Sequence, residues 1–145
     1  MINKIVDRLY VGDVFDANML NFSNPEVITA VLNVCEEKDD FSKLSWMKYL
    51  HIPFPDHKQI PKEAFDKCME WLEQRYKTQG RILIHCAIGH SRSPVICAAF
   101  MTKMRLVESM AHGLYLVKTA RPQICPDPIV AGSAEALLVM KVQRV

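Results

Sequence analysis

The segment from residue 81 to residue 101 restricts the fold more than any other part of the chain, because one short turn joins an apolar strand to an apolar helix. Residues 81–85 (RILIH) are apolar and β-branched enough for a buried strand, and residues 93–101 (SPVICAAFM) have the length and small side chains of a buried helix. Gly89 allows the sharp bend between them. Such a turn directs backbone N–H groups and the positive end of a helix dipole at one point. The sequence therefore predicts an anion-binding loop.

Cys86 and Arg92 stand at the two ends of this loop and suit chemistry on a phosphate ester. Arg92 keeps its charge and can donate two N–H groups to two phosphate oxygens. A cysteine that faces a helix N-terminus and a guanidinium ionises readily, so we predict that Cys86 acts as a thiolate nucleophile. The alternative is a buried structural cysteine beside a surface arginine. His85, Gly89, Ser93 and the flanking strand and helix count against that alternative.

The order His85-Cys86, five residues, then Arg92-Ser93 resembles the active-site signature of the cysteine-based protein tyrosine phosphatases. Residues 89–94 (GHSRSP) resemble the dual-specificity branch of that family, in its small atypical form. The segments 9–12 (LYVG) and 121–126 (RPQICP) lie where the family has similar segments, so the resemblance covers nearly the whole chain. It implies a phosphoprotein phosphatase that hydrolyses phosphotyrosine and phosphoserine or phosphothreonine through a phosphocysteine intermediate, without a metal or other cofactor. A second class stays open, a catalytically weak phosphate-binding module that acts as a scaffold.

The resemblance also assigns roles around the nucleophile. Ser93 would donate a hydrogen bond to the sulfur as it leaves phosphorus, and His85 would orient the cysteine loop. The loop residues that would bind the phosphate are Ala87, Ile88, Gly89, His90, Ser91 and Arg92. Because Ala87 and Ile88 carry no positive charge for additional phosphates, protein phosphate is favoured over phosphoinositides as substrate.

Asp56 matches the position of the family's general acid, 30 residues before Cys86 on a loop that follows an expected strand. The alternative is that Asp56 is only a turn residue after Pro55. Asp39 and Asp40, in an acidic run that we interpret as a solvated loop, are rival acids, as is Asp127. Asp127 also has a structural explanation as the N-cap of a helix that begins at Pro128. The family often has Asn at that position, bonded to the phosphate loop, and Asp puts that contact in question.

Cys35 is a candidate for redox control. It ends the expected strand 27–35, whose carboxyl end should lie beside the phosphate loop if that strand and strand 81–85 are parallel neighbours. Some relatives carry a resolving cysteine in a similar Asn-x-Cys-x-Glu context, and such a thiol would protect Cys86 from over-oxidation by forming a disulfide. The alternative is a buried cysteine at a strand end.

The remaining elements alternate before helices accumulate. We expect strands at 5–12, 27–35, 48–54 and 81–85, and helices at 13–22, 61–80, 93–101, 107–119 and 128–142. This order predicts an α/β fold, a short and mainly parallel central sheet flanked by helices, like that of protein tyrosine phosphatases. A chain of 145 residues, half of them hydrophobic, can bury one core, so we expect a single domain over residues 1–145.

Composition restricts the partners. The net charge of +2 does not indicate nucleic acid, and we interpret Lys103, Arg105, Lys118 and Arg121 as a mildly positive surface. There is no signal-like apolar core at residues 1–15, no membrane-length apolar run and no lipidation motif, so no membrane association is expected. The five scattered cysteines fit reduced thiols, and no pair of them has zinc-ligand spacing. We therefore expect a monomer of the cytoplasm or the nucleus that acts on phosphoproteins and holds no metal.

Overall fold

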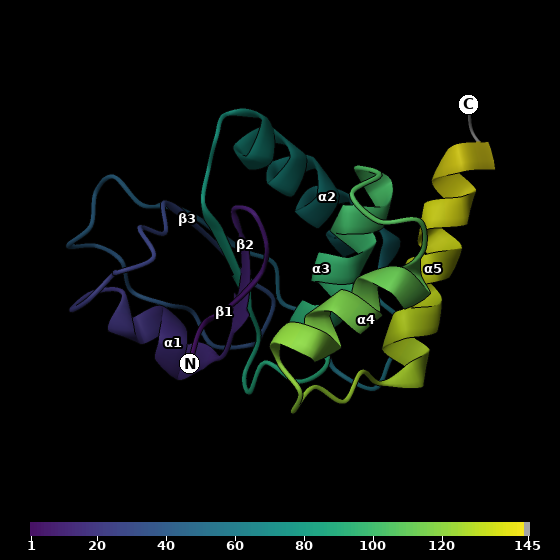
Figure 1. Cartoon of the computed structure of the whole chain (residues 1–145), viewed down its shortest axis with the longest axis horizontal. Helices are drawn as coiled ribbons and strands as arrows, with labels where there is room; N and C mark the ends of the chain where they lie inside the picture. Colours follow the sequence, from purple (N-terminus) through teal and green to yellow (C-terminus); the bar gives the residue numbers. More distant parts are fainter. Residues whose placement is uncertain (144–145) are drawn as a thin grey trace.

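A five-stranded sheet in the order β1-β2-β5-β3-β4 organises the chain. The computed structural model describes residues 1–143 and is shown in Figure 1. The strands are β1 (Asn3–Val6), β2 (Leu9–Gly12), β3 (Ala30–Asn33), β4 (Lys48–His51) and β5 (Ile82–His85). The helices are α1 (Val14–Met19), α2 (Lys62–Lys77), α3 (Arg92–Lys103), α4 (Met110–Ala120) and α5 (Pro128–Gln143).

The sheet is mainly parallel. β2, β5, β3 and β4 run parallel to one another, and only β1 pairs in the antiparallel sense, with β2. The predicted α/β fold with a short, mainly parallel sheet is therefore confirmed. The prediction of one strand over residues 5–12 is wrong, because the chain turns at residues 7–8 and forms the β1–β2 hairpin. Arg8 makes this turn with a left-handed φ of 66°. Gly, Asn and Asp are the residues that usually mark such a conformation in a sequence, so an arginine gave no signal of a turn.

Alternate residues of the strands enter two separate apolar layers. One face of the sheet packs against α2, α3, α4 and α5, and the other face is covered by α1 and by loops (Figure 1). The first layer includes Leu9, Val11, Leu32, Ile82 and Ile84 from the strands, and the second includes Tyr10, Val31 and Leu83. The predicted apolar face of α2 is confirmed, since Phe65, Cys68, Met69 and Leu72 are buried and Tyr76 is partly buried.

The middle of the sheet positions the loop that follows β5. In the parallel register, Gly12 of β2 and Asn33 of β3 both lie beside His85, so three strands end at one edge. The helix that leaves this edge, α3, is buried from Arg92 to Met101 and contacts α4, α5, α2 and the strands β2 and β5. A loop with a strand fixed behind it and a buried helix in front of it has little freedom to move.

The length and hydropathy of the helices bear on the expectation from the sequence that the protein does not associate with a membrane. Within residues 1–143, no helix combines the length and the hydropathy that crossing a bilayer requires.

Candidate active site

Residues 86–91 form the loop between β5 and α3, at the carboxyl end of the central strand. In open α/β sheets this edge is where ligands usually bind. Every carbonyl group of residues 87–90 is held by a donor from another segment. Val14 N–H donates to Ala87, the Arg121 guanidinium to Ile88 and Gly89, and Cys125 N–H to His90.

The N–H groups of the same loop behave differently. Among the described residues, the backbone N–H groups of residues 87–91 donate to no protein acceptor, although each neighbouring carbonyl is bonded. The loop leads directly into the first turn of α3, whose helix dipole adds positive potential. Free N–H groups at a helix N-terminus form a concave site that suits an oxyanion.

Gly89 is required by its surroundings as well as by its backbone. Its φ is +71°, and a Cβ placed on it would lie 2.5 Å from the carbonyl oxygen of Gly12 and 2.7 Å from Nη2 of Arg121. The sequence-based assignment of the sharp bend to Gly89 is confirmed.

Arg121 corrects an expectation from the sequence. It was interpreted as part of a positive surface, but its exposed fraction is only 2%. Its guanidinium donates to the carbonyls of Gly89 (2.9 Å), Ile88 (3.3 Å) and Met1 (2.7 Å), and to Oδ1 of Asn3 (2.9 Å). A guanidinium offers five donors in one plane, which makes it suited to hold several carbonyls at once. Arg121 is therefore a structural residue behind the loop, and the sequence did not reveal this role because its four acceptors are far away along the chain.

The Cys86 side chain lies under the loop and contacts Ser93. The sulfur is 3.2 Å from the Ser93 hydroxyl oxygen and 3.5 Å from the Ser93 backbone nitrogen. Both residues are buried, with Cys86 2% exposed and Ser93 fully covered. These contacts place the sulfur at the base of the loop, beside the first turn of α3.

Arg92 is anchored on one side and unpaired on the other. Its Nη1 donates to both carboxylate oxygens of Glu36 (2.6 and 2.9 Å) and to the carbonyl of Phe54 (3.0 Å). Its Nε is buried and has no acceptor among the described residues. A buried unpaired donor is costly unless a ligand satisfies it. The Nε edge of Arg92 is thus available for an oxyanion.

Charge supports this arrangement. Burial alone would lower the pKa of Arg92, but the Glu36 carboxylate and Cys86 raise it overall. The same bond with Arg92 lowers the pKa of Glu36. Both groups are therefore charged at neutral pH. Glu36 belongs to the acidic run that was interpreted as a solvated loop, and its side chain is indeed 63% exposed. The sequence did not predict that this exposed carboxylate also binds Arg92.

Asp56 is connected to the loop through Ser91. The Ser91 hydroxyl donates to Oδ1 of Asp56 (2.9 Å) and accepts from the backbone N–H of Asp127 (3.0 Å). Asp56 lies on the loop that follows β4, as expected, with its side chain 26% exposed. Asp127 accepts from Ile129 and Val130 N–H, so its predicted N-cap role is confirmed. Its contact with the loop is made by its backbone and does not need the Asn of the family pattern.

His85 is fully buried behind the nucleophile. Its Nε2 lies 2.6 Å from Oδ2 of Asp39, and its Nδ1 lies 3.2 Å from the carbonyl of Cys86. Asp39 has a side chain only 4% exposed, so it is not a flexible acid that could reach a substrate. The interpretation of Asp39 as a rival general acid is wrong. The acidic run contributes Asp39 to the interior, while Asp40 is exposed and its pKa is lowered by hydrogen bonds with Ser42.

Cys35 lies at the same sheet edge as Cys86. β3 and β5 are parallel neighbours, and Val34 N–H donates to the carbonyl of His85, as the redox hypothesis required. The Cys35 thiol donates to Oδ1 of Asn33 (3.0 Å), and burial raises its pKa. Burial also raises the pKa of Cys68 and Cys97 to about 12, so these two remain protonated. All five cysteines are free, and only Cys125 is exposed.

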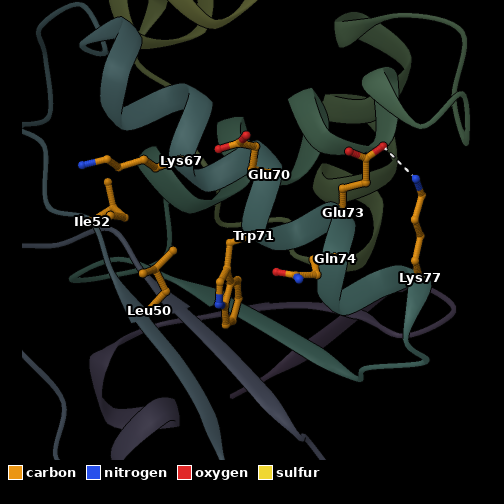
Figure 2. A pocket seen from close by; sticks show the side chains of 8 residues that line it. All are labelled: Leu50, Ile52, Lys67, Glu70, Trp71, Glu73, Gln74 and Lys77. Atoms are coloured by element: carbon orange, nitrogen blue, oxygen red, sulfur yellow. Dashed lines mark ion pairs between the residues drawn. The ribbon is translucent and has the colours of Figure 1, made fainter.

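A cavity of about 630 Å³ lies elsewhere, between the β4 end of the sheet and α2. Figure 2 shows the eight side chains that line it: Leu50, Ile52, Lys67, Glu70, Trp71, Glu73, Gln74 and Lys77. None of the predicted site residues belongs to this set. Among the described residues, no cluster of three or more His, Cys, Asp or Glu side chains could hold a metal ion.

The fold and the site together define a class of protein. A central parallel strand leads into a loop that contains a buried cysteine, and an arginine with a free N–H edge begins the helix that follows. This combination is that of the cysteine-dependent phosphatases. Comparison with known proteins gives the particular family. The model of the dual specificity phosphatase catalytic domain matches residues 9–132, and the chain belongs to this family.

Individual relatives resemble this chain in sequence and in structure. A probable dual specificity protein phosphatase of Dictyostelium discoideum is 33% identical over 130 residues, which are 87% of this chain and 31% of that protein. Dual specificity protein phosphatase 1B of Arabidopsis thaliana is 29% identical over 133 residues, 88% of this chain and 75% of the relative. The crystal structure of DUSP15 superposes with a TM-score of 0.85 at 26% identity and covers 99% of this chain and 90% of its own. The chain thus spans about a third of the length of the first relative and most of the length of the second.

Proposed function

We propose that this protein hydrolyses phosphotyrosine and phosphoserine or phosphothreonine in proteins, through a phosphocysteine intermediate. The observation that carries the proposal is the polarity of the loop. Its carbonyls are bonded outward, while the N–H groups of residues 87–91 and the Nε of Arg92 have no acceptor within residues 1–143. This arrangement surrounds the position in front of the Cys86 sulfur with donors. It therefore suits the three equatorial oxygens of a phosphoryl group under attack.

In the first step, the Cys86 thiolate forms a bond to phosphorus and the bond from phosphorus to the ester oxygen breaks. The loop N–H groups and Arg92 hold the three equatorial oxygens. Asp56 gives its proton to the departing oxygen, which would otherwise leave as a poor leaving group. The Ser91 hydroxyl supports this role because it connects Asp56 to the loop that binds the phosphate.

In the second step, water attacks the phosphocysteine and the sulfur–phosphorus bond breaks. Asp56, now ionised, accepts a proton from the water. The Ser93 hydroxyl, 3.2 Å from the sulfur, donates a hydrogen bond to the thiolate as it leaves. His85, fixed by Asp39, orients the backbone at Cys86.

The loop also supports protein phosphate as the substrate class. Its two exposed residues, Ala87 and Ile88, are uncharged, and Ile88 is 61% exposed. Apolar groups at the rim suit a peptide or an aromatic ring better than the additional phosphates of an inositol lipid. The relatives named above are called dual specificity phosphatases, which favours both classes of phosphorylated residue for this chain.

The alternative function, a scaffold that binds phosphate without hydrolysis, would need a defect among the groups just described. Hydrolysis of para-nitrophenyl phosphate, followed by phosphotyrosine and phosphothreonine peptides, separates the two functions. We expect turnover of all three and its loss in Cys86→Ser, with inorganic phosphate still bound by the variant, because the loop donors remain. Phosphate binding without turnover by the unaltered protein would establish the scaffold instead.

A further inference from the structure

His57 connects the loop that carries Asp56 to the first turn of α5. Its Nδ1 lies 2.8 Å from Oδ2 of Asp127, and its Nε2 lies 3.6 Å from Oδ2 of Asp56. No sequence pattern singles out this residue, because an exposed histidine in a loop is common. In the structure its ring lies between two carboxylates that come from different elements.

Ser91 completes a closed set of contacts. Its hydroxyl donates to Asp56 and accepts from the backbone of Asp127, so the phosphate loop touches both partners of His57. The acid loop, the start of α5 and the phosphate loop are therefore joined at one point through Asp56, His57, Asp127 and Ser91. Loss of the His57 ring would leave Asp56 with only its bond to Ser91 and the N–H of residue 57.

The backbone at His57 is unusual. Its φ is 63°, in the left-handed region that residues with a Cβ seldom adopt. Such a conformation persists where surrounding contacts hold it, and these positions concentrate at functional sites. Here the holding contact is the bond of the ring to Asp127. The loop conformation at Asp56 thus depends on that bond.

The charges around His57 favour its protonated form. The groups that face it are Asp127 at the N-cap of α5, Asp56 from its own loop and Arg92 from α3. The hydrogen bond with Asp127 and the charge of Asp56 raise the pKa of His57, while Arg92 opposes them. The pKa of Asp127 is lowered mainly by the same hydrogen bond.

We propose that His57 is a positioning residue for the general acid: its imidazolium, bound to Asp127, holds Asp56 where it can protonate the leaving oxygen. This inference rests on the proposed phosphatase function and deepens it. Exposed ion pairs contribute little to stability, and the His57 side chain is 77% exposed. The main effect of His57 is therefore on proton transfer, where a small displacement of the acid is costly, and its effect on stability is small.

The kinetic test compares leaving groups in His57→Asn, because Asn accepts a left-handed backbone but cannot bridge the two carboxylates. With phenyl phosphate, whose leaving group needs a proton, we expect kcat to fall about tenfold. With an activated fluorinated coumarin phosphate we expect a change within about twofold, and inhibition by inorganic phosphate should stay the same. The matched control is His112→Asn, an exposed histidine of α4 whose contacts are with Glu108 and Ser109, just before that helix. Equal loss on both substrates, or no loss on phenyl phosphate, overturns the proposal.

Asp127→Asn tests the partner. It removes the negative charge but keeps an amide oxygen for the helix cap, and it should reproduce the loss with phenyl phosphate. The double variant should lose no more than either single variant, because both changes break one interaction. Additive losses would show that the two residues act independently, and the proposal would fail.

A readout independent of activity separates this proposal from the proposed function. The titration of the His57 ring, followed by NMR in the unaltered protein and in Asp127→Asn, should show a lower midpoint in the variant. An unchanged midpoint overturns the pairing even in an active enzyme. A shifted midpoint in a protein that hydrolyses none of the substrates would show that the pair exists and that the phosphatase function has failed.

Discussion

At the residue scale, the signature residues depend on side chains outside the signature. Arg92 has its direction fixed by Glu36, His85 by Asp39, and the carbonyls of the loop by Arg121. Each of these supporting residues lies far along the chain from the group it supports. They place donors in advance, so little reorganisation is needed when charge develops on the phosphoryl oxygens.

Asp56→Asn tests the general acid at this scale. We expect kcat for phenyl phosphate to fall by about 10² to 10⁴, because an amide cannot give up a proton, with a much smaller change for activated esters. The measurement is a plot of log kcat against leaving-group acidity for the variant and the unaltered protein. If Asp127→Asn were to give that full loss while Asp56→Asn did not, the assignment would move to Asp127.

Arg121→Met tests the support behind the loop. The carbonyls of Ile88 and Gly89 would lose their donor in a buried place, so we expect the free energy of unfolding to fall by about 2–4 kcal/mol. The affinity for inorganic phosphate should fall as well, because the loop N–H groups lose their alignment. Urea unfolding and phosphate inhibition measure the two effects. Lys43→Met, at an exposed position, is the control for loss of one positive charge. If Arg121→Met were less stable but bound phosphate with unaltered affinity, Arg121 would support the fold and not the alignment of the loop N–H groups.

At the element scale, the strands and helices followed from local patterns, and most were predicted. The run before Cys86 is continuously apolar, as in a strand buried on both faces, and the apolar face of α2 repeats with the helical period. The β1–β2 turn was missed because it uses Arg8 in a left-handed conformation where sequences usually place Gly or Asn.

The site was predictable only in part, for a physical reason. Cys86, Arg92 and Ser93 lie within one strand–loop–helix unit, and their spacing alone brings them together. Glu36, Asp39 and Arg121 reach that unit from other elements, and a run of charges is normally solvated. No local pattern distinguishes the acid that is buried against a histidine from the acid that faces water.

The loop that carries Asp56 is joined to the start of α5 by the ion pair of His57 and Asp127, whose strength depends on pH. Because the pKa of His57 is raised in the folded protein, its protonated ring contributes fully to folding stability below the ordinary pKa of 6.5. That contribution is lost as pH rises through the raised pKa. Asp127, with a lowered pKa, contributes above its ordinary value of 3.8 and loses this as pH falls. The difference in Tm between the unaltered protein and His57→Asn should therefore be larger near about pH 5.5 than near about pH 9. Thermal melts at both values measure it, and equal differences would contradict the pair.

The predicted redox role of Cys35 depends on the parallel pairing of β3 and β5. They place Cys35 and Cys86 at one sheet edge, and we predict that mild peroxide produces a disulfide between them. The bond requires Cα atoms within about 7 Å after any local movement. Disulfide mapping by mass spectrometry and recovery of activity by reductant in Cys35→Ser measure it. Equal recovery in the variant, or no linked peptide, would leave Cys35 as a packing residue.

At the scale of the whole molecule, two apolar layers share one sheet. α3 contacts three other helices as well as β2 and β5, so the larger layer is continuous with the site, and the strands between the layers connect it to the smaller one. We therefore expect residues 1–145 to unfold as one domain, and the expected monomer also stays a prediction that size-exclusion chromatography can check.

Single-tryptophan variants test this cooperativity. Trp71, on α2, packs against the layer that contains α3, and Trp46 precedes Met47, which lies in the other layer. Urea unfolding of Trp46→Phe and of Trp71→Phe is followed by fluorescence of the remaining tryptophan and by far-UV circular dichroism. In each variant the two signals should give coincident transitions. A second transition confined to one tryptophan would divide the chain into two units.

The contacts of Arg121 have a consequence for the order in which the chain is synthesised. The bond between Arg121 and Gly89 spans 32 residues, and the bond between Arg121 and Asn3 spans 118. A ribosome releases the amino-terminal part first, so Cys86 and its loop emerge before the guanidinium that arranges them. A nascent chain that ends before Arg121 would carry the nucleophile without the arranged loop. The arrangement of the loop carbonyls is thus completed only in chains that have passed Arg121, after most of the fold has been synthesised.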